Sequence, residues 1–64
     1  MDMVDVIEVD IKPPHTIRVL ARGYSEGNAE AFIKIAVMRR GVENSFYTTC
    51  RPGKYQDGDV RLQT

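Results

Sequence analysis

His15 and Cys50 are the two residues of this sequence that have the character of a base and a nucleophile. A thiolate beside an imidazole can attack an electrophilic carbon, but the two groups must lie within hydrogen-bond reach. His15 follows two prolines in an expected loop, whereas Cys50 lies on the apolar side of an expected strand. The spacing does not bring them together, so we interpret them as a loop histidine and a small buried hydrophobic residue.

Two pairs of carboxylates offer cation binding or acid–base chemistry. Asp57-Gly58-Asp59 supplies only two ligands, whereas a calcium loop needs more oxygens at set spacing, and Asp-Gly is a common turn dipeptide. Glu8 and Asp10 share one face of an expected strand, where Arg18 and Arg22 would keep them ionised. The glycines match no phosphate-binding loop. We therefore expect no catalytic residue, no metal site, no cofactor and no enzymatic activity.

Basic and aromatic side chains indicate a different chemistry, which is contact with nucleic acid. Arginines neutralise phosphates, and tyrosines stack on bases. The candidate residues for this alternative function are Arg18, Arg22, Arg39, Arg40 and Tyr47. Acidic residues are interleaved with them, and the formal net charge is zero, so no long-range attraction to nucleic acid is expected. Nucleic acid is therefore the second choice of partner.

Residues 28–40 predict the helix around which the other elements are arranged. Asn28 can cap its first turn, and Gly41 stands where a left-handed residue commonly ends a helix. Its apolar arc is wider than the roughly 100° stripe that a surface helix needs. The rival interpretation is a strand over residues 32–37, which are rich in β-branched side chains. The matched ends and the alanines favour the helix.

Alternating apolar residues predict two strands before the helix, over residues 4–11 and 16–22. Pairing Ile11 with Ile17 and Val9 with Val19 in an antiparallel hairpin gathers one apolar face. Because Pro13 and Pro14 separate the strands, we expect an irregular or longer connection than a tight turn. Residues 45–50 predict a third strand, and residues 60–62 form either a further short strand or a loose tail.

These elements predict a single small α+β domain over residues 1–64, of order ββαβ or ββαββ, with a mainly antiparallel sheet and the helix on one face. A right-handed crossover places the third strand beside the first, which becomes central. We expect the helix to cover an apolar face built from Ile7, Val9, Ile11, Ile17, Val19 and Phe46. The face that stays open would carry Glu8, Asp10, Arg18, Arg22 and Tyr47.

The composition is that of a folded domain, with 42% hydrophobic and 28% charged residues. A lone cysteine excludes an internal disulfide. The acidic start of the chain lacks the basic region of a secretory signal, and no apolar run approaches the roughly 18 residues of a membrane span. We therefore expect a cytoplasmic protein that does not enter a membrane.

A small sheet shelters only one side of the helix. We expect it to cover Phe32, Ile35 and Ala36 and to leave Ile33, Val37 and Met38 exposed. These last three side chains either lie under the C-terminal residues 55–62 or form a contact surface. Since a chain of this length buries a small core, we favour the contact surface. The leading hypothesis is a non-enzymatic protein–protein interaction module that forms a homodimer or binds a small protein through Ile33, Val37 and Met38.

Overall fold

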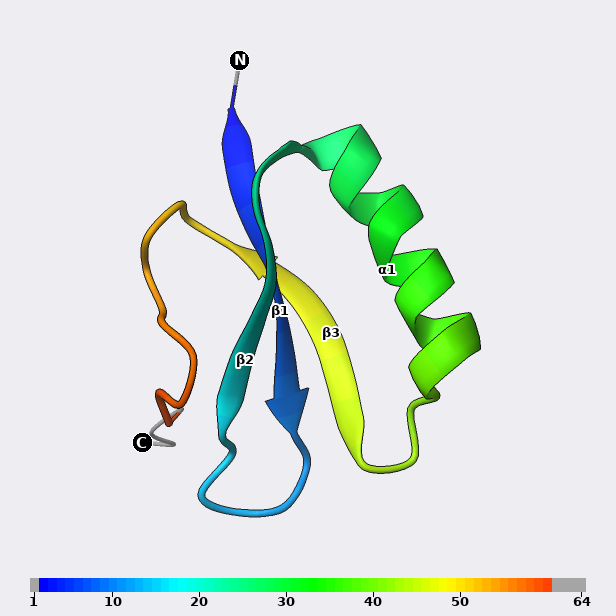
Figure 1. Ribbon diagram of the computed structural model, residues 1–64, viewed down its shortest axis with the longest axis vertical. Helices are drawn as coiled ribbons and strands as arrows, with labels where there is room; N and C mark the ends of the chain where they lie inside the picture. The colour runs from blue at the N-terminus through cyan, green and yellow to red at the C-terminus, as the bar shows by residue number, and fades with distance from the viewer. Residues whose placement is uncertain (1, 61–64) are drawn as a thin grey trace.

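The computed structural model describes residues 2–60, and within this range the chain forms three strands and one helix. The elements are β1 (Met3–Asp10), β2 (Ile17–Ser25), α1 (Glu26–Arg40) and β3 (Ser45–Cys50). The sheet order is β2-β1-β3, and β1 is antiparallel to both neighbours. The predicted α+β class, the ββαβ order and the central first strand are confirmed (Figure 1).

The hairpin of β1 and β2 has a register two residues away from the predicted one. Val9 pairs with Ile17 and Ile7 with Val19. A shift of two residues keeps every side chain on its face, so the hydrophobic pattern fits both registers equally well. The expected longer connection is confirmed, because residues 11–16 form the loop and the Asp10 N–H donates to the Thr16 carbonyl at 3.0 Å.

The helix begins two residues before the predicted start and ends where predicted. Ser25 is the N-cap, and its hydroxyl accepts a hydrogen bond from the Asn28 backbone N–H at 3.3 Å. The Asn28 cap was therefore a wrong prediction: Ser25, whose backbone is extended, caps a helix that begins at Glu26, and this places Asn28 inside the first turn. Gly41 ends the helix at a φ of 77°, a conformation that favours glycine, and donates to the Val37 carbonyl. The strand interpretation of residues 32–37 is wrong.

The helix packs on the opposite sheet face from the one predicted. Arg40 contacts Glu8, and the Tyr47 hydroxyl donates to the carbonyl of Gly41, so α1 lies on the face expected to stay open. The helix contacts the sheet through Ala29 and Ala36, which are both buried. Small side chains let a helix lie near a sheet, and Glu8 is tolerated there because arginines neutralise it.

Residues 51–60, here called the C-terminal segment, cover the apolar face instead. Ile7, Val9 and Ile17 form the buried cluster, and Tyr55 packs against it. In Figure 1 this segment and α1 lie on opposite sides of the strands. The alternative in which residues 55–62 lie over the helix is therefore contradicted for residues 55–60, and residues 61 and 62 lie outside the described residues.

The C-terminal segment also runs along the outer edge of β2. The Ile17 N–H donates to the Asp59 carbonyl at 2.7 Å, and the Gly58 N–H donates to the Ile17 carbonyl at 2.9 Å. A single antiparallel bridge joins Thr16 to Val60. Of the alternative fourth strand over residues 60–62, the structure describes only Val60, which makes this bridge. Residues 61 and 62 lie outside the described range.

Candidate functional site

The predicted helix surface consists of Ile33, Val37 and Met38. Met38 is 85% exposed and Val37 is 37% exposed, whereas Ile33 is partly buried. Ile33 and Val37 are four residues apart and therefore share one flank of the helix. Glu30 belongs to this flank too, and it lines a hollow together with Thr49 of β3. The flank of Ile33 and Val37 therefore faces the β3 side of the sheet, and Met38 is turned about 100° from Val37 around the helix.

A second apolar surface lies on the other flank of the helix, which faces β2. Phe32, Ile35 and Ala36 line a hollow of about 450 Å³ together with Leu20. Ala36 is buried as predicted, but Ile35 is 53% exposed, so its predicted burial is wrong. The sequence did carry a signal for the exposure of Ile35. Successive residues of a helix are rotated by about 100°, so Ile35 and Ala36 cannot both point toward the sheet.

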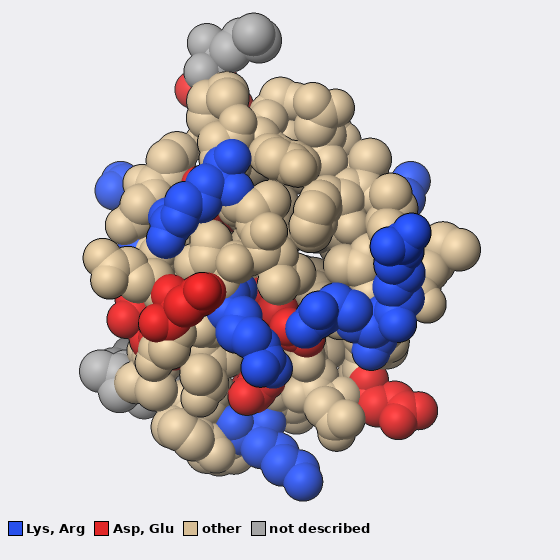
Figure 2. Space-filling view, in the orientation of Figure 1, with Lys and Arg blue, Asp and Glu red and all other residues tan. Residues whose placement is uncertain are grey.

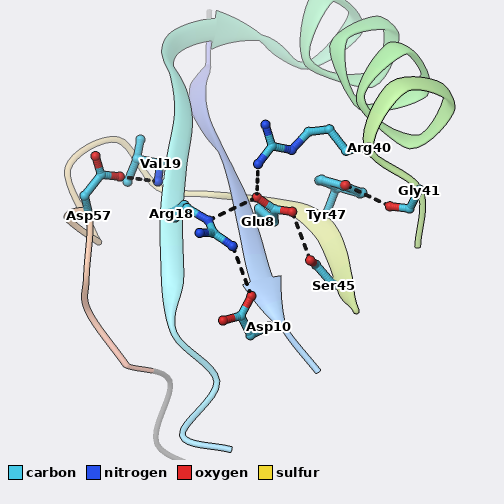
Figure 3. Close-up of polar contacts among 9 residues, drawn as sticks. All are labelled: Glu8, Asp10, Arg18, Val19, Arg40, Gly41, Ser45, Tyr47 and Asp57. Atoms are coloured by element: carbon cyan, nitrogen blue, oxygen red, sulfur yellow. Dashed lines mark hydrogen bonds and ion pairs between the residues drawn. The ribbon is translucent and has the colours of Figure 1, made fainter. Parts of the chain in front are cut away.

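The polar residues under the C-terminal end of α1 converge on Glu8, whose exposure is only 4% (Figure 3). Its Oε1 accepts from Arg40 Nη2 at 2.9 Å and from Arg18 Nε at 3.3 Å, and its Oε2 accepts from Ser45 Oγ at 2.9 Å. Burial on its own would raise the pKa of Glu8, but these hydrogen bonds and the arginine charges outweigh it and lower the pKa. The hydrogen bond to Glu8, followed by the negative charge of Glu8, raises the pKa of Arg40.

Asp5 forms a comparable centre on the other side of the sheet, and the sequence reasoning missed it. It is 2% exposed and accepts from the backbone N–H groups of Gly53 at 2.8 Å and Gly23 at 3.0 Å. Arg22 Nη1 lies 2.9 Å from Asp5 Oδ2, and Arg22 Nη2 donates to the Tyr55 carbonyl. The hydrogen bond from Gly53 is the largest cause that lowers the pKa of Asp5. The acidic residue between Val4 and Val6 was the only sequence signal.

The five residues considered for nucleic-acid contact do not form one basic surface. Arg18, Arg22 and Arg40 are each paired with a carboxylate. The hydroxyl of Tyr47, which is partly buried, donates to Gly41. Within residues 2–60, Arg39 makes no ion pair. Figure 2 shows Lys and Arg side chains interleaved with Asp and Glu on one face. This mixture does not favour binding to a polyanion.

The residues with nucleophile or acid character have separate structural partners. His15 Nδ1 lies 3.0 Å from the Asp10 carbonyl, whereas Cys50 packs against the Ile7 cluster. Burial is the main cause that raises the pKa of the Cys50 thiol, which reduces its nucleophilic fraction at neutral pH. Asp57 and Asp59 accept hydrogen bonds from backbone N–H groups of Val19 and Gln56. Within residues 2–60, no three His, Cys, Asp or Glu side chains are placed to hold a metal ion.

In the described part of the chain, no helix has both the length and the apolar character needed to cross a membrane. Comparison of the chain with protein-family models, with curated proteins and with solved structures finds no match.

Proposed function

We propose that this protein is a non-enzymatic protein–protein interaction module that associates with a second copy of itself through the exposed surface of α1. The observation that supports the proposal is the exposure of Met38 and Val37, on a helix that the C-terminal segment does not cover within the described residues. Exposed apolar side chains that lie together on a folded domain commonly mark a contact site.

The helix surface is too small to form a stable dimer interface on its own. Fully burying a Val or Met side chain contributes about 1.5–3 kcal/mol, and Val37 is already partly covered. A stable interface usually buries about 800 Å² on each partner. Ile33, Val37 and Met38 cannot supply such an area, so adjoining parts of the molecule must take part in the contact.

The test is the oligomeric state measured by sedimentation over a wide range of concentration. The wild-type chain is expected to be dimeric at about 100 µM, and Val37→Glu is expected to weaken the dimer at least about a hundredfold, because the interface would bury an unpaired carboxylate. Ala31→Glu is the matched control. It places the same charge on an exposed position of the same helix but beside the hollow at Tyr24 and Phe32, so it should leave the dimer intact.

Circular dichroism establishes whether both variants keep the fold. A wild-type chain that stays monomeric at all concentrations contradicts the proposal, and so does a folded Val37→Glu variant that dimerises as well as Ala31→Glu.

A further inference from the structure

The outer edge of β3 carries backbone groups that are open to pairing. β3 lies at one end of the sheet and pairs with β1. The Ile11 N–H donates to the Asn44 carbonyl, and antiparallel strands alternate residues that point toward and away from the neighbouring strand. The backbone groups of Ser45, Tyr47 and Thr49 therefore point outward. Within residues 2–60 no hydrogen bond uses these groups.

Tyr47 and Thr49 are the accessible part of this edge. Ser45 is buried at 7% exposure beside Glu8, whereas Thr49 is exposed and Tyr47 is partly exposed. The strand sequence SFYTTC contains neither a charged residue nor a proline, which are the features that usually prevent an edge strand from pairing with another chain.

The first part of the opposite edge of the sheet, at Ile17 and Val19, is covered by the chain itself. The Ile17 N–H donates to the Asp59 carbonyl, and the Ile17 carbonyl accepts from the Gly58 N–H. The Asp57 carboxylate accepts from the Val19 N–H at 2.6 Å. The two edges therefore differ in kind. The C-terminal segment covers the first outward groups of β2, whereas within residues 2–60 the outward backbone groups of Tyr47 and Thr49 make no hydrogen bond.

We propose that β3 pairs antiparallel with β3 of a second copy, about a two-fold axis that passes through Thr48. In this register Tyr47 lies opposite Thr49 of the second copy, and each of these residues donates one hydrogen bond and accepts one. Thr48 lies opposite its own counterpart at a position where side chains come closest, and a threonine pair is favourable there. The buried Ser45 takes no part.

This arrangement rests on the proposed self-association and specifies its geometry. A two-fold axis perpendicular to the sheet keeps both helices on the same face. Because the flank of Ile33 and Val37 faces the β3 side, the two flanks then face each other across the new strand pair. The strand edge supplies the adjoining contact that the small helix surface lacks. A two-fold pairing of β3 with β3 uses the same edge of both copies, so the association stops at a dimer.

A disulfide cross-link tests the register. In a Cys50→Ser background, Thr48→Cys is expected to form a covalent dimer with oxidised glutathione as the electron acceptor. Directly opposed residues of this kind have Cα atoms about 4.5 Å apart, within the range that a disulfide spans. The matched control is Thr49→Cys, which lies on the same strand and is more exposed. Thr49 lies opposite Tyr47 of the second copy. Thr49 of the second copy is two residues further along the strand, about 7 Å away, which is too far for a disulfide between the two introduced cysteines.

The expected result is that most of the Thr48→Cys chain becomes cross-linked while Thr49→Cys remains at the collisional background. Amide hydrogen exchange of the wild-type chain gives an independent measurement. The Tyr47 and Thr49 amides should become protected as concentration rises, whereas the Thr48 amide, which points toward β1, should be protected throughout.

The outcomes separate the two proposals. A wild-type chain that is always monomeric overturns both of them. A wild-type dimer in which Thr49→Cys cross-links as well as Thr48→Cys, or in which the Tyr47 and Thr49 amides stay unprotected, overturns the strand pairing and leaves the helix contact standing. Edge protection that survives in Val37→Glu supports the strand pairing and overturns the helix contact.

Discussion

Two buried carboxylates of β1 tie the central strand to the parts of the chain that cover it. Asp5 holds the turn at Gly53 and, through Arg22, the carbonyl of Tyr55. Glu8 holds Arg40 at the end of the helix. An ionised carboxylate in such a place is stable only when several donors replace its water, and each of these groups has at least three.

Removal of the Asp5 side chain is expected to destabilise the domain more than removal of any exposed acid. Asp5→Ala removes the buried carboxylate that accepts from the N–H groups of Gly53 and Gly23, and the expected loss is about 3 kcal/mol of unfolding free energy. The measurement is urea denaturation followed by circular dichroism. Asp5→Asn keeps one acceptor oxygen and should lose about half as much, which gives a folded variant to measure if the alanine variant does not fold.

The control for this change is Asp10→Ala. Asp10 is more exposed and makes one 3.4 Å contact with Arg18, a kind of pair that contributes roughly 0–1 kcal/mol. If Asp5→Ala and Asp10→Ala shift the urea midpoint equally, the structural role given to Asp5 is wrong.

At the scale of the elements, periodicity located the strands but could not assign their faces. Residues 4–11 place Val6 beside Glu8 on one face and Ile7 beside Val9 on the other, so each face is part apolar. Which of them the helix covers depends on charge neutralisation by Arg40, a contact 32 residues away in sequence. The hairpin register was undetermined for a related reason, since a shift of two residues preserves both faces.

The candidate contact surface was predictable in part. An apolar arc wider than its sheet implies exposed residues somewhere on the helix, and Met38 and Val37 are exposed as expected. The exposure of Ile35 was not expected, because it depends on how the helix is rotated over the sheet. The pairing of Arg22 with Asp5 was also missed, because it requires the irregular register between β1 and β2 near Val6.

The start of α1 gives a prediction at this scale. Ser25→Ala removes the acceptor for the Asn28 N–H and is expected to lower the unfolding free energy by about 1 kcal/mol. Asn28→Ala changes a residue inside the first turn and should be neutral or slightly stabilising, because alanine has the higher helix propensity. Thermal unfolding of both variants is the measurement. A larger loss in Asn28→Ala than in Ser25→Ala would contradict the assigned cap.

The whole molecule has three layers within the described residues: the C-terminal segment, the sheet and the helix (Figure 1). The two outer layers meet the sheet at different carboxylates, Asp5 for the segment and Glu8 for the helix. Both groups must be ionised to hold their donors as the structure shows. The packing of the molecule is therefore linked to pH through the same two residues.

Acid is accordingly expected to destabilise the whole fold. The pKa values of Asp5 and Glu8 in the folded chain lie below their ordinary values of 3.8 and 4.5. A lowered pKa contributes stability that is fully present above the ordinary value and is lost as pH falls through the folded value. The urea midpoint should therefore be nearly constant from about pH 7 to about pH 5.5 and should fall below about pH 4.5.

The variant Asp5→Asn/Glu8→Gln identifies the groups responsible. It should be less stable than the wild-type chain at neutral pH, because it loses two charge-assisted sets of hydrogen bonds. Its urea midpoint should nevertheless fall less steeply between about pH 4.5 and about pH 3, since the two groups whose protonation is linked to unfolding are gone. If the urea midpoint of the variant falls as steeply with pH as that of the wild-type chain, other carboxylates cause the pH dependence. Asp5 and Glu8 would then not be the groups that join the layers.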